Sequence, residues 1–311
     1  MSQVMKILIV ANGKLGDGRF SHFVNEQVAS IQDLGVELLP FKITRKGIGG
    51  YVKEIILLRR EIRNLNSCPV IIHAHSGLCG FIANMQRTFP VVTTYHGSDI
   101  HSGGWRLILS KISMNLSKYN IFVSSKLMER ASYNKSNSCV LPCGIDVDKI
   151  YKIPRLEALK KLKRQKNFVL FSGSFSNPVK NYKLAQEAMQ FFPDLELVEL
   201  EGYNRDEVCL LMNAARCLLM TSVREGSPQV IKEAMACGTP IVSVDVGDVK
   251  EVIGNTSGCF IAEYNAVDVA NKIRESLNFE QKTNGRERII ELGLDNKAIA
   301  QKIINIYSLI K

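Results

Sequence analysis

The feature that most constrains this chain is a regular alternation of short β-branched runs with longer helical segments. The run KILIVAN at residues 6–12 is followed by a helical pattern over residues 20–34, and later runs include VIIHAH at 70–75 and NIFVSS at 120–125. Short strands separated by helices of ten or more residues are typical of βαβ units in a parallel sheet. The sequence therefore predicts an α/β fold.

A second series of the same kind begins near residue 168, after a basic segment at 147–167 that contains no strand pattern. A chain of 311 residues is too long for one comfortable hydrophobic core, so two domains are expected. The predicted fold class is α/β, with two doubly wound Rossmann-like domains at residues 1–146 and 147–295 that face a cleft. Ligands of such sheets bind at the carboxyl ends of the strands, which makes the cleft the expected site.

Composition limits the class of partner. The net charge of +10 and the pI near 9.2 indicate an anionic partner, either nucleic acid, a membrane surface or a phosphorylated substrate. An aromatic content of 7% and the absence of a stacking or groove-reading motif argue against nucleic acid. The eight cysteines show no metal-ligand spacing, and no run approaches 18 apolar residues, so we expect a cytosolic protein without a membrane span.

The stretch REGSPQVIKEAMACGTPIVS at residues 224–243 has the marks of a short helix with an anion site at its start. Ser227 is suited to cap the helix, Pro228 to occupy its first position, and Gly238 to end it in a left-handed conformation. The helix then starts where the strand run CLLMTS ends, so its free N–H groups and positive dipole end lie at a strand end. Such a helix start suits a diphosphate.

Two glutamates bracket that helix start. Glu225 lies before the first turn and Glu233 about two turns inside, which separates their anchor points by roughly 10 Å or a little more. A carboxylate accepts hydrogen bonds from vicinal hydroxyls, so one glutamate could hold a ribose and the other a sugar that is being moved. The pair predicts a site for a sugar joined to a nucleoside diphosphate.

The segment EGSPQVIKEAMACGTPIVS resembles the signature of retaining glycosyltransferases of glycosyltransferase family 4, which have the two-domain GT-B fold. Further segments are similar to family motifs and follow the expected order. They are HAHSGLCGFIA and VVTTYHGSD in the first half, LPCGIDVDKI at the boundary and FSGSFSNPVKN after it. The resemblance covers nearly the whole chain, and it implies that a last helix at 296–311 crosses back to the first domain.

The resemblance implies a role for each matching residue. Glu233 would bind the nucleotide ribose; the catalytic residues would be Glu225 on the donor sugar, Lys180 on the diphosphate and His96 at the reaction centre. It implies no metal and no cofactor, but a donor that is a UDP- or GDP-linked sugar. The charge that grows on the departing diphosphate would be stabilised by fixed Lys, Arg and helix N–H groups. The other residues assigned to the nucleotide-sugar or to the first glycine-rich loop are Gly13, Gly16, Gly173, Arg224, Gly226 and Ser227.

Two positions depart from the family pattern. Ser174 stands where the family has a phosphate-loop arginine, and Cys143 stands where it has a hinge asparagine. Loss of the arginine weakens the expected stabilisation of the leaving group. Our hypothesis is that Arg224 or Lys183 supplies the missing charge.

Four histidines fall near predicted strand ends of the first domain: His73, His75, His96 and His101. A His-x-His pair invites a metal interpretation, but apart from Asp99 no cysteine or carboxylate completes a ligand set around it. We expect no metal. Such histidines are more often satisfied by hydrogen bonds or contact substrate, and we assign His96 to substrate.

The basic region at 42–63 has two interpretations that the sequence leaves open. Seven basic side chains face only two acidic ones there, and a helical pattern begins near residue 51. The helix could cover the sheet with a solvated outer face. Alternatively, the basic cluster could contact anionic lipid or a lipid-diphosphate acceptor.

Taken together, the sequence predicts a cytoplasmic retaining glycosyltransferase at the inner face of the membrane. It would move a sugar from a nucleotide-diphosphate sugar to a glycan or lipid-linked acceptor in cell-envelope or exported polysaccharide synthesis. Two alternatives share the architecture: a nucleotide-sugar epimerase or hydrolase of GT-B fold, and a non-catalytic nucleotide-sugar-binding protein. The donor sugar, the base, the acceptor and the linkage depend on loop shapes that a sequence does not give.

Overall fold

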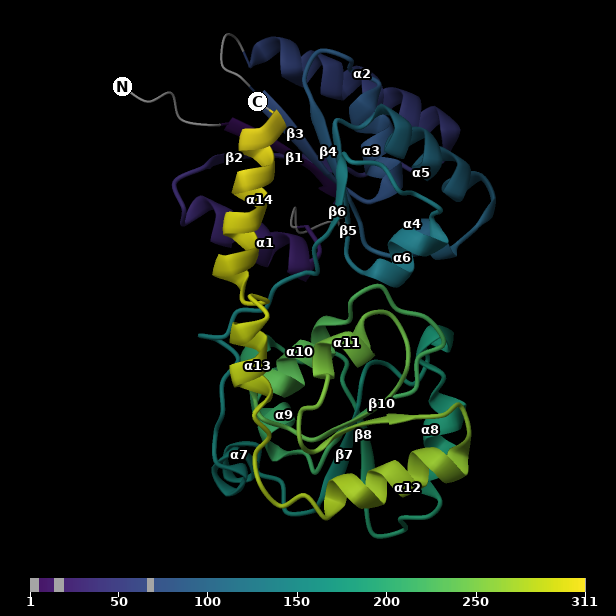
Figure 1. Cartoon of the computed structure of the whole chain (residues 1–311), viewed down its shortest axis with the longest axis vertical. Helices are drawn as coiled ribbons and strands as arrows, with labels where there is room; N and C mark the ends of the chain where they lie inside the picture. Colours follow the sequence, from purple (N-terminus) through teal and green to yellow (C-terminus); the bar gives the residue numbers. More distant parts are fainter. Residues whose placement is uncertain (1–5, 14–19, 66–69, 311) are drawn as a thin grey trace. The chain divides into compact units, whose positions relative to one another are not determined.

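The chain folds as two compact units. The computed structural model describes residues 6–13, 20–65 and 70–310. Unit 1 comprises Met1–Gly144 together with Asn296–Lys311, and unit 2 comprises Ile145–Asp295. Each unit has its own parallel sheet with helices packed on it (Figure 1).

Unit 1 contains a six-stranded parallel sheet with the order β2-β1-β3-β4-β5-β6. The order reverses between β1 and β3, which are neighbours in the sheet although β2 lies between them in sequence. In an open parallel sheet, the carboxyl ends of the strands at such a reversal are the usual place for a ligand. The strands are β1 (Lys6–Asn12), β2 (Glu37–Ile43), β3 (Val70–His75), β4 (Val91–Tyr95), β5 (Tyr119–Phe122) and β6 (Ser138–Val140).

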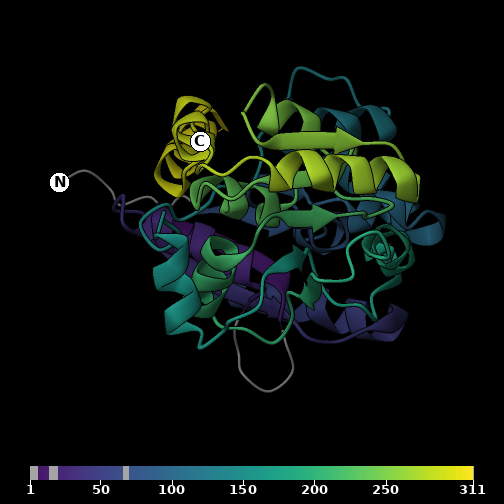
Figure 2. The same ribbon diagram turned by 90° about the horizontal axis from the view of Figure 1, so that it is seen from below.

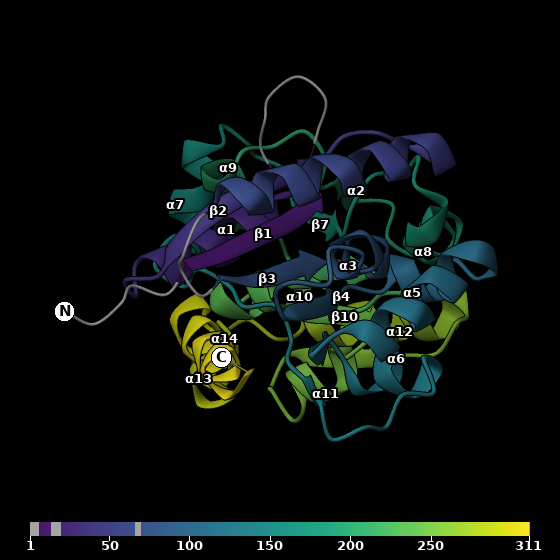
Figure 3. The ribbon, with the colours of Figure 1, turned by 90° about the horizontal axis from the view of Figure 1, so that it is seen from above.

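The helices of unit 1 cover both faces of this sheet. Leu58 of α2 and Ile72 of β3 belong to one buried cluster, and because side chains alternate along a strand, His73 points to the other face. There the hydroxyl of Tyr307, in α14, lies 2.6 Å from His73 Nδ1. Figure 3 shows α2 and α14 on opposite sides of β1 and β3. The helices are α1 (His22–Gln32), α2 (Gly47–Asn64), α3 (Gly77–Asn84), α4 (Ser98–His101), α5 (Gly104–Leu116), α6 (Ser125–Arg130) and α14 (Asn296–Ile310).

Unit 2 contains a five-stranded parallel sheet with the order β11-β10-β9-β7-β8. Its order reverses between β7 and β9. All four residues of the interior strand β7 are buried, as expected when helices cover both faces of a parallel sheet. The strands are β7 (Phe168–Phe171), β8 (Glu196–Glu199), β9 (Leu218–Met220), β10 (Ile241–Val244) and β11 (Cys259–Ala262).

The helices of unit 2 include α12, which packs against β10, β11 and α8 (Figure 2). A short 3₁₀ turn, η1 (Pro178–Lys180), follows β7. The helices are α7 (Arg155–Lys161), α8 (Tyr182–Met189), α9 (Arg205–Ala214), α10 (Gln229–Ala236), α11 (Val249–Ile253), α12 (Ala266–Leu277) and α13 (Gly285–Glu291). The α/β class with two doubly wound parallel sheets is thus confirmed. None of the helices in the described ranges is long and apolar enough to cross a membrane.

Candidate active site

In unit 2 the chemistry-bearing residues gather where β7 and β9 end, at the reversal of strand order. Two loops leave the sheet there, one running from Ser172 to Lys180 and one from Thr221 to Gly226. They are tied together because Val223 N–H donates to the Val179 carbonyl at 2.9 Å. The Thr221 hydroxyl adds a bond of 3.0 Å to the Lys180 carbonyl. The two loops therefore form one hydrogen-bonded edge.

Lys180 and Glu225, both assigned to catalysis from the sequence, meet at this edge. Lys180 Nζ lies 2.7 Å from Glu225 Oε1, and each side chain is 18% exposed. Gly173 makes the approach of Lys180 feasible, because a Cβ at Gly173 would lie 2.9 Å from Lys180 Cε. From the sequence, the two residues belong to different parts of the donor site, and nothing in their spacing predicts that they pair with each other.

Two buried hydroxyl groups lie at the same strand ends. Ser172 follows β7 and is 4% exposed, and Ser222 follows β9 by two residues and is fully buried. Within the described part of the chain, neither side-chain oxygen makes a hydrogen bond. Buried polar groups normally have a partner, so these hydroxyls mark the β7–β9 edge as a place where a polar ligand can bind.

Helix α10 starts one residue later than the sequence suggested, and Ser227 does not cap it. Pro228 stands just outside the helix, which begins at Gln229. The expected end is confirmed, because Gly238 follows the helix with a φ of +65°. The cap fails because the Ser227 hydroxyl is engaged elsewhere.

Ser227 belongs to a buried polar network with Lys232 and Asp248. The Ser227 hydroxyl donates to Asp248 Oδ2 at 2.5 Å, and Lys232 Nζ donates to the Ser227 oxygen, also at 2.5 Å. Lys232 is fully buried and lies 3.8 Å from Asp248. Burial raises the pKa of Asp248, while the charge of Lys232 and the bond from Ser227 act to lower it. This network fixes the segment that follows Glu225 against the start of α11.

Glu233 has an ionic partner that the sequence analysis missed. Its carboxylate is 2.5 Å from Arg205 Nη1, and the residue is only 6% exposed. Arg205 is the first residue of α9, which starts with a capping box formed by Asn204 and Glu207. That box is visible in the sequence and predicts the helix start, but it does not reveal that Arg205 reaches α10.

The other residues of unit 2 to which the sequence assigned a role differ in how exposed they are to solvent. Gly226 is buried and Arg224 is exposed, and within the described residues no ion pair engages Arg224. Ser174, at the position of the family arginine, shares a hydrogen bond of 2.9 Å with Ser176. The Lys183 ammonium is 85% exposed and lies 3.9 Å from Glu187, on its own helix. Of the two compensating cations considered, Arg224 is the one that no ion pair among the described residues engages.

In unit 1 the corresponding strand ends hold stacked imidazole rings instead of ion pairs. The rings of His73 and His75 lie 4.5 Å apart, and those of His75 and His96 lie 5.4 Å apart. His75 Nδ1 is 3.1 Å from His96 Nε2, and His96 Nδ1 is 3.6 Å from the Cys143 sulfur. Both ring nitrogens of His96 thus have protein partners.

Burial keeps these imidazoles neutral at physiological pH. It lowers the pKa of His96 to about 4 and that of His73 to about 3, where the neighbouring His96 adds to the effect. The pKa of His75 is also well below its ordinary value, from burial first and then from the two flanking histidines. His73 is held by Tyr307 and by Thr94 Oγ1 at 2.8 Å. Among the described residues, no group of three or more His, Cys, Asp or Glu could hold a metal ion.

Asp99 and Gly13 complete the carboxyl edge of unit 1. Asp99 is 6% exposed and accepts hydrogen bonds from the backbone N–H of Gly77 at 2.7 Å and of Gly97 at 3.0 Å. These bonds join the loops that follow β3 and β4. Gly13 donates its N–H to the Ile43 carbonyl at 3.0 Å. Gly16 lies outside the described residues.

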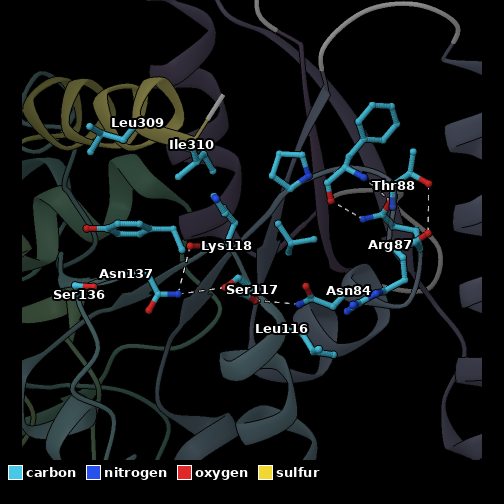
Figure 4. A pocket seen from close by; sticks show the side chains of 15 residues that line it. Asn84, Arg87, Thr88, Leu116, Ser117, Lys118, Ser136, Asn137, Leu309 and Ile310 are labelled. Atoms are coloured by element: carbon cyan, nitrogen blue, oxygen red, sulfur yellow. Dashed lines mark hydrogen bonds between the residues drawn. The ribbon is translucent and has the colours of Figure 1, made fainter.

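Two cavities of similar size lie at opposite edges of the unit 1 sheet. One of about 650 Å³ opens at the carboxyl ends, between Asn12, Thr44, Ser76 and Asp99. Another of about 670 Å³ lies at the amino ends of β4 and β5 (Figure 4). There Asn84 donates to Ser117 at 2.9 Å. Only the first cavity is at the edge where parallel sheets bind ligands.

The family comparisons agree with this architecture. The family model "Glycosyl transferases group 1" matches residues 155–293, and the model "Glycosyltransferase Family 4" matches residues 23–149. Together they span most of the chain.

Individual relatives have low sequence identity to this chain but align with most of its length. The chain is 23% identical to N,N'-diacetylbacillosaminyl-diphospho-undecaprenol alpha-1,3-N-acetylgalactosaminyltransferase of Campylobacter jejuni, covering 91% of this chain and 88% of that protein. It is 25% identical to the Bacillus subtilis glycosyltransferase TuaC, named for teichuronic acid biosynthesis, over 66% of this chain and 60% of that protein. The structure of Anabaena HepE in complex with UDP aligns with a TM-score of 0.75 at 16% identity, over 98% of this chain and 100% of that one. With both units matched to family models and the fold shared over almost its full length, the chain belongs to the group 1 glycosyltransferases, glycosyltransferase family 4, and has the GT-B fold.

Proposed function

We propose that this glycosyltransferase is a retaining, metal-independent enzyme whose donor is a nucleotide-diphosphate hexose. The observation that carries the proposal is the meeting of Lys180 and Glu225 at the strand reversal of unit 2, beside two buried hydroxyls that have no partner within the described chain. A fixed ammonium beside a carboxylate suits a ligand that has a phosphate next to a sugar. The acceptor would be a glycan or a lipid-linked sugar in cell-envelope or exported polysaccharide synthesis.

In this proposal, different side chains bind the nucleoside end and the sugar end of the donor. Glu233 accepts hydrogen bonds from the ribose hydroxyls, with Arg205 holding the carboxylate in place. Glu225 accepts from the donor sugar, and Lys180 approaches the diphosphate with the N–H groups near Gly226 and Ser227. Because HepE forms a complex with UDP, uridine diphosphate is the first nucleotide to test.

Transfer with retention requires the acceptor hydroxyl to attack from the side of the leaving group. The bond between the anomeric carbon and the diphosphate oxygen breaks, and its electron pair stays on that oxygen. The acceptor oxygen forms the new bond and gives its proton to the diphosphate. Lys180 and Arg224 stabilise the growing charge without a metal ion. His96 would contact the transferred sugar through its ring edge, because both of its nitrogens have protein partners and its ring packs against His75 and Phe23.

A binding-only function is the second candidate, because Ser174 stands where the family places a phosphate-loop arginine. Such a protein would bind donor but show no turnover. A hydrolase or epimerase of this fold would instead convert the donor in the absence of any acceptor. Our proposal also places the enzyme in the cytoplasm, at the inner face of the membrane, where lipid-linked acceptors are assembled.

Calorimetric titration of UDP, GDP and ADP in the presence of EDTA tests the donor assignment. We expect one nucleotide to bind wild type and to bind Glu233→Ala about thirtyfold more weakly, because a buried charged hydrogen-bond acceptor is lost. Glu280→Ala, which alters an exposed glutamate, serves as the control. Equal binding by Glu233→Ala would remove the ribose assignment, and binding only after metal is restored would remove metal independence.

The reaction is tested separately with the nucleotide-sugar that corresponds to the nucleotide identified. Proton NMR of the transferred sugar should show the anomeric configuration of the donor, and inversion would contradict the retaining mechanism. Nucleotide release without acceptor would favour the hydrolase. Binding without release, with lipid-linked and free glycan acceptors present, would favour the binding-only function.

A further inference from the structure

The cavity at the amino ends of β4 and β5 has a lining that suits an anionic ligand. Its described lining contains two cations, Arg87 before β4 and Lys118 before β5, and no carboxylate. Asn84 and Ser117 lie between these cations in the view of Figure 4. The volume of about 670 Å³ is in the range of small-molecule sites, and the excess of positive charge attracts an anion.

Both cations are available to a ligand. Within residues 6–13, 20–65 and 70–310, no ion pair or hydrogen bond engages the Arg87 guanidinium or the Lys118 ammonium, and both residues are exposed. The described lining also contains no histidine or cysteine, and this is not the edge at which parallel sheets usually bind substrates. The cavity is therefore suited to binding a ligand and not to catalysis.

A buried glutamine fixes the turn that carries Arg87. Gln86 is 7% exposed, and its Oε1 accepts from the backbone N–H of Thr88 at 2.6 Å and of Phe89 at 2.8 Å. Its Nε2 donates to the Phe89 carbonyl at 2.7 Å. Inside this turn Arg87 has a φ of +63°, a conformation that a residue other than glycine keeps only where its surroundings enforce it. The turn therefore presents Arg87 at the cavity from a fixed backbone.

The engagement of backbone groups at this edge favours a carboxylate over a phosphate as the ligand's anionic group. Phosphate sites usually offer free backbone N–H groups, at a helix start or in a nest. Here Gln86 accepts from the N–H groups of Thr88 and Phe89, and the N–H of Lys118 donates to the Val91 carbonyl at 2.8 Å. The ligand must then be held by side chains, and the guanidinium fork of an arginine matches a carboxylate.

The rest of the lining suits sugar rings. Tyr119 and Leu309, which is 76% exposed, supply apolar surface, and the exposed Ser136 supplies a hydroxyl. A sugar ring has apolar C–H faces and hydroxyl edges, so it can use both kinds of surface.

An adjoining cavity extends this site beyond one sugar. It has a volume of about 440 Å³ and shares Gln86, Thr88 and Phe89 with the first cavity. Arg63, at the end of α2, lines it, and no ion pair in the described part of the chain engages that guanidinium. A ligand with an anionic group on each of several units can therefore contact cations in both cavities.

We propose that the amino edge of unit 1 binds an acidic glycan, a chain of uronic-acid sugars, whose carboxylates are held by Arg87 and Lys118 and whose rings lie beside Tyr119. The next sugar of the chain reaches Arg63 in the adjoining cavity. This site lies at the opposite edge of the sheet from Asp99, so it is separate from the candidate active site and does not rest on the proposed function. It gives the protein a second place to hold a glycan, away from the carboxyl edge.

Calorimetric titration of trigalacturonate, a chain of three uronic acids, into the full chain tests the ligand class. We expect saturable binding at one site. The methyl ester of the same trisaccharide has the same rings without the charges, and it should bind at least about tenfold more weakly. A triglutamate peptide has three carboxylates without sugar rings and should also be weaker. Equal binding of the ester would overturn the charge assignment, and equal or tighter binding of triglutamate would identify an acidic peptide site in place of a glycan site.

Two pairs of variants locate the binding. Arg87→Asn/Lys118→Gln removes both cations, and asparagine tolerates the positive φ, so the turn is kept while trigalacturonate binding falls about tenfold or more. Lys160→Gln/Lys166→Gln removes two exposed charges from unit 2 and should change nothing.

The second pair tests the cavity itself without a change of charge. Ser136→Trp fills the cavity and should weaken binding about tenfold, whereas Asn134→Trp, at an exposed residue of the same loop outside the lining, should not. Equal losses within either pair, or no loss in Arg87→Asn/Lys118→Gln, would overturn the assignment to this cavity.

UDP titration of the same variants keeps this inference apart from the proposed function. Arg87→Asn/Lys118→Gln should bind UDP as wild type does, because neither residue lies in unit 2. Saturating UDP should likewise leave the affinity for trigalacturonate unchanged. Competition between the two ligands would mean that they share one site and would overturn the amino-edge assignment. If UDP does not bind but trigalacturonate does, the donor assignment alone is wrong; the reverse result removes the glycan site alone.

Discussion

The two units place different chemistry at equivalent edges of their sheets. Unit 2 has ion pairs there: Lys180 with Glu225, and Arg205 with Glu233. Unit 1 has neutral stacked imidazoles, which burial keeps uncharged by lowering the pKa values of His73 and His96. The same fold thus supports one charged and one neutral strand edge.

The difference teaches how the two edges can recognise ligands. An ion pair in a partly dry environment is strong and fixes geometry, but it depends on both partners. The imidazoles of unit 1 carry no charge that would compete for phosphate, and both ring nitrogens of His73 and of His96 are already engaged by the protein. In the proposed function, this difference directs the donor diphosphate to unit 2.

The largest expected effect comes from breaking the buried network in unit 2. Lys232→Met leaves the Asp248 carboxylate buried without its cation, and we expect unit 2 to lose about 3 to 5 kcal/mol of unfolding free energy. Hydrogen exchange followed by mass spectrometry measures the loss in peptides from unit 2 while peptides from unit 1 serve as the internal reference. Lys250→Met, at an exposed lysine on α11, should cost far less. The double variant Lys232→Met/Asp248→Leu should recover most of the loss, and a loss no larger than that of Lys250→Met would show that the network is not stabilising.

The second largest effect is expected on the rate of catalysis when Lys180 is replaced. Lys180→Met removes the cation beside the leaving group, so kcat should fall about 100- to 1000-fold while the KM for donor changes much less. Steady-state transfer assays measure both constants. Lys180→Arg keeps the charge and should recover part of kcat, and Lys166→Met is the exposed-lysine control. A tenfold or smaller fall in kcat for Lys180→Met would assign the stabilisation to other groups.

Much of the fold could be predicted from the sequence, because alternating strands and helices leave few arrangements for a chain of this length. The loop positions of Lys180 and Glu225 were also predictable, since each lies in the segment between a strand and the next helix. Their pairing was not, because it depends on β7 and β9 being neighbours in the sheet while β8 separates them in sequence. Sequence spacing gives the strand ends but not which ends adjoin.

Two other features were not predicted for the same reason, which is that tertiary packing and not sequence spacing creates them. Arg205 and Glu233 belong to different helices, and only the packing of α9 on α10 brings them together. The Ser227 cap failed for a related reason, because a fully buried lysine five residues later competes for its hydroxyl. A local rule for capping does not include a partner that tertiary packing supplies.

Lowering the pH should destabilise unit 1, and this tests the contrast between its neutral imidazoles and the ion pairs of unit 2. The histidines have lower pKa values in the fold than their ordinary value of 6.5, so the unfolded chain binds more protons below that pH. The stabilisation that these imidazoles provide is complete above pH 6.5. As the pH falls from 6.5 toward 4, the free energy of unfolding decreases by about 1.4 kcal/mol per pH unit for each imidazole that stays neutral in the folded chain. Urea unfolding followed by Trp105 emission reports on unit 1. A midpoint that does not change between pH 7 and 5 would mean that the imidazoles stay hydrated.

The smallest expected effect comes from the bond that joins α14 to the imidazole stack. Tyr307→Phe keeps the ring in the core but removes the hydroxyl that lies 2.6 Å from His73 Nδ1. The loss should be about 1 to 2 kcal/mol in unit 1, since a buried ring nitrogen is left without one partner. Hydrogen exchange of peptides from β3 and α14 measures it, with Tyr119→Phe at the start of β5 as the control. Because the change removes no charge, it should leave unit 2 and nucleotide binding unaltered, and a matching loss of UDP affinity would show that the neutral edge and the charged edge are coupled after all.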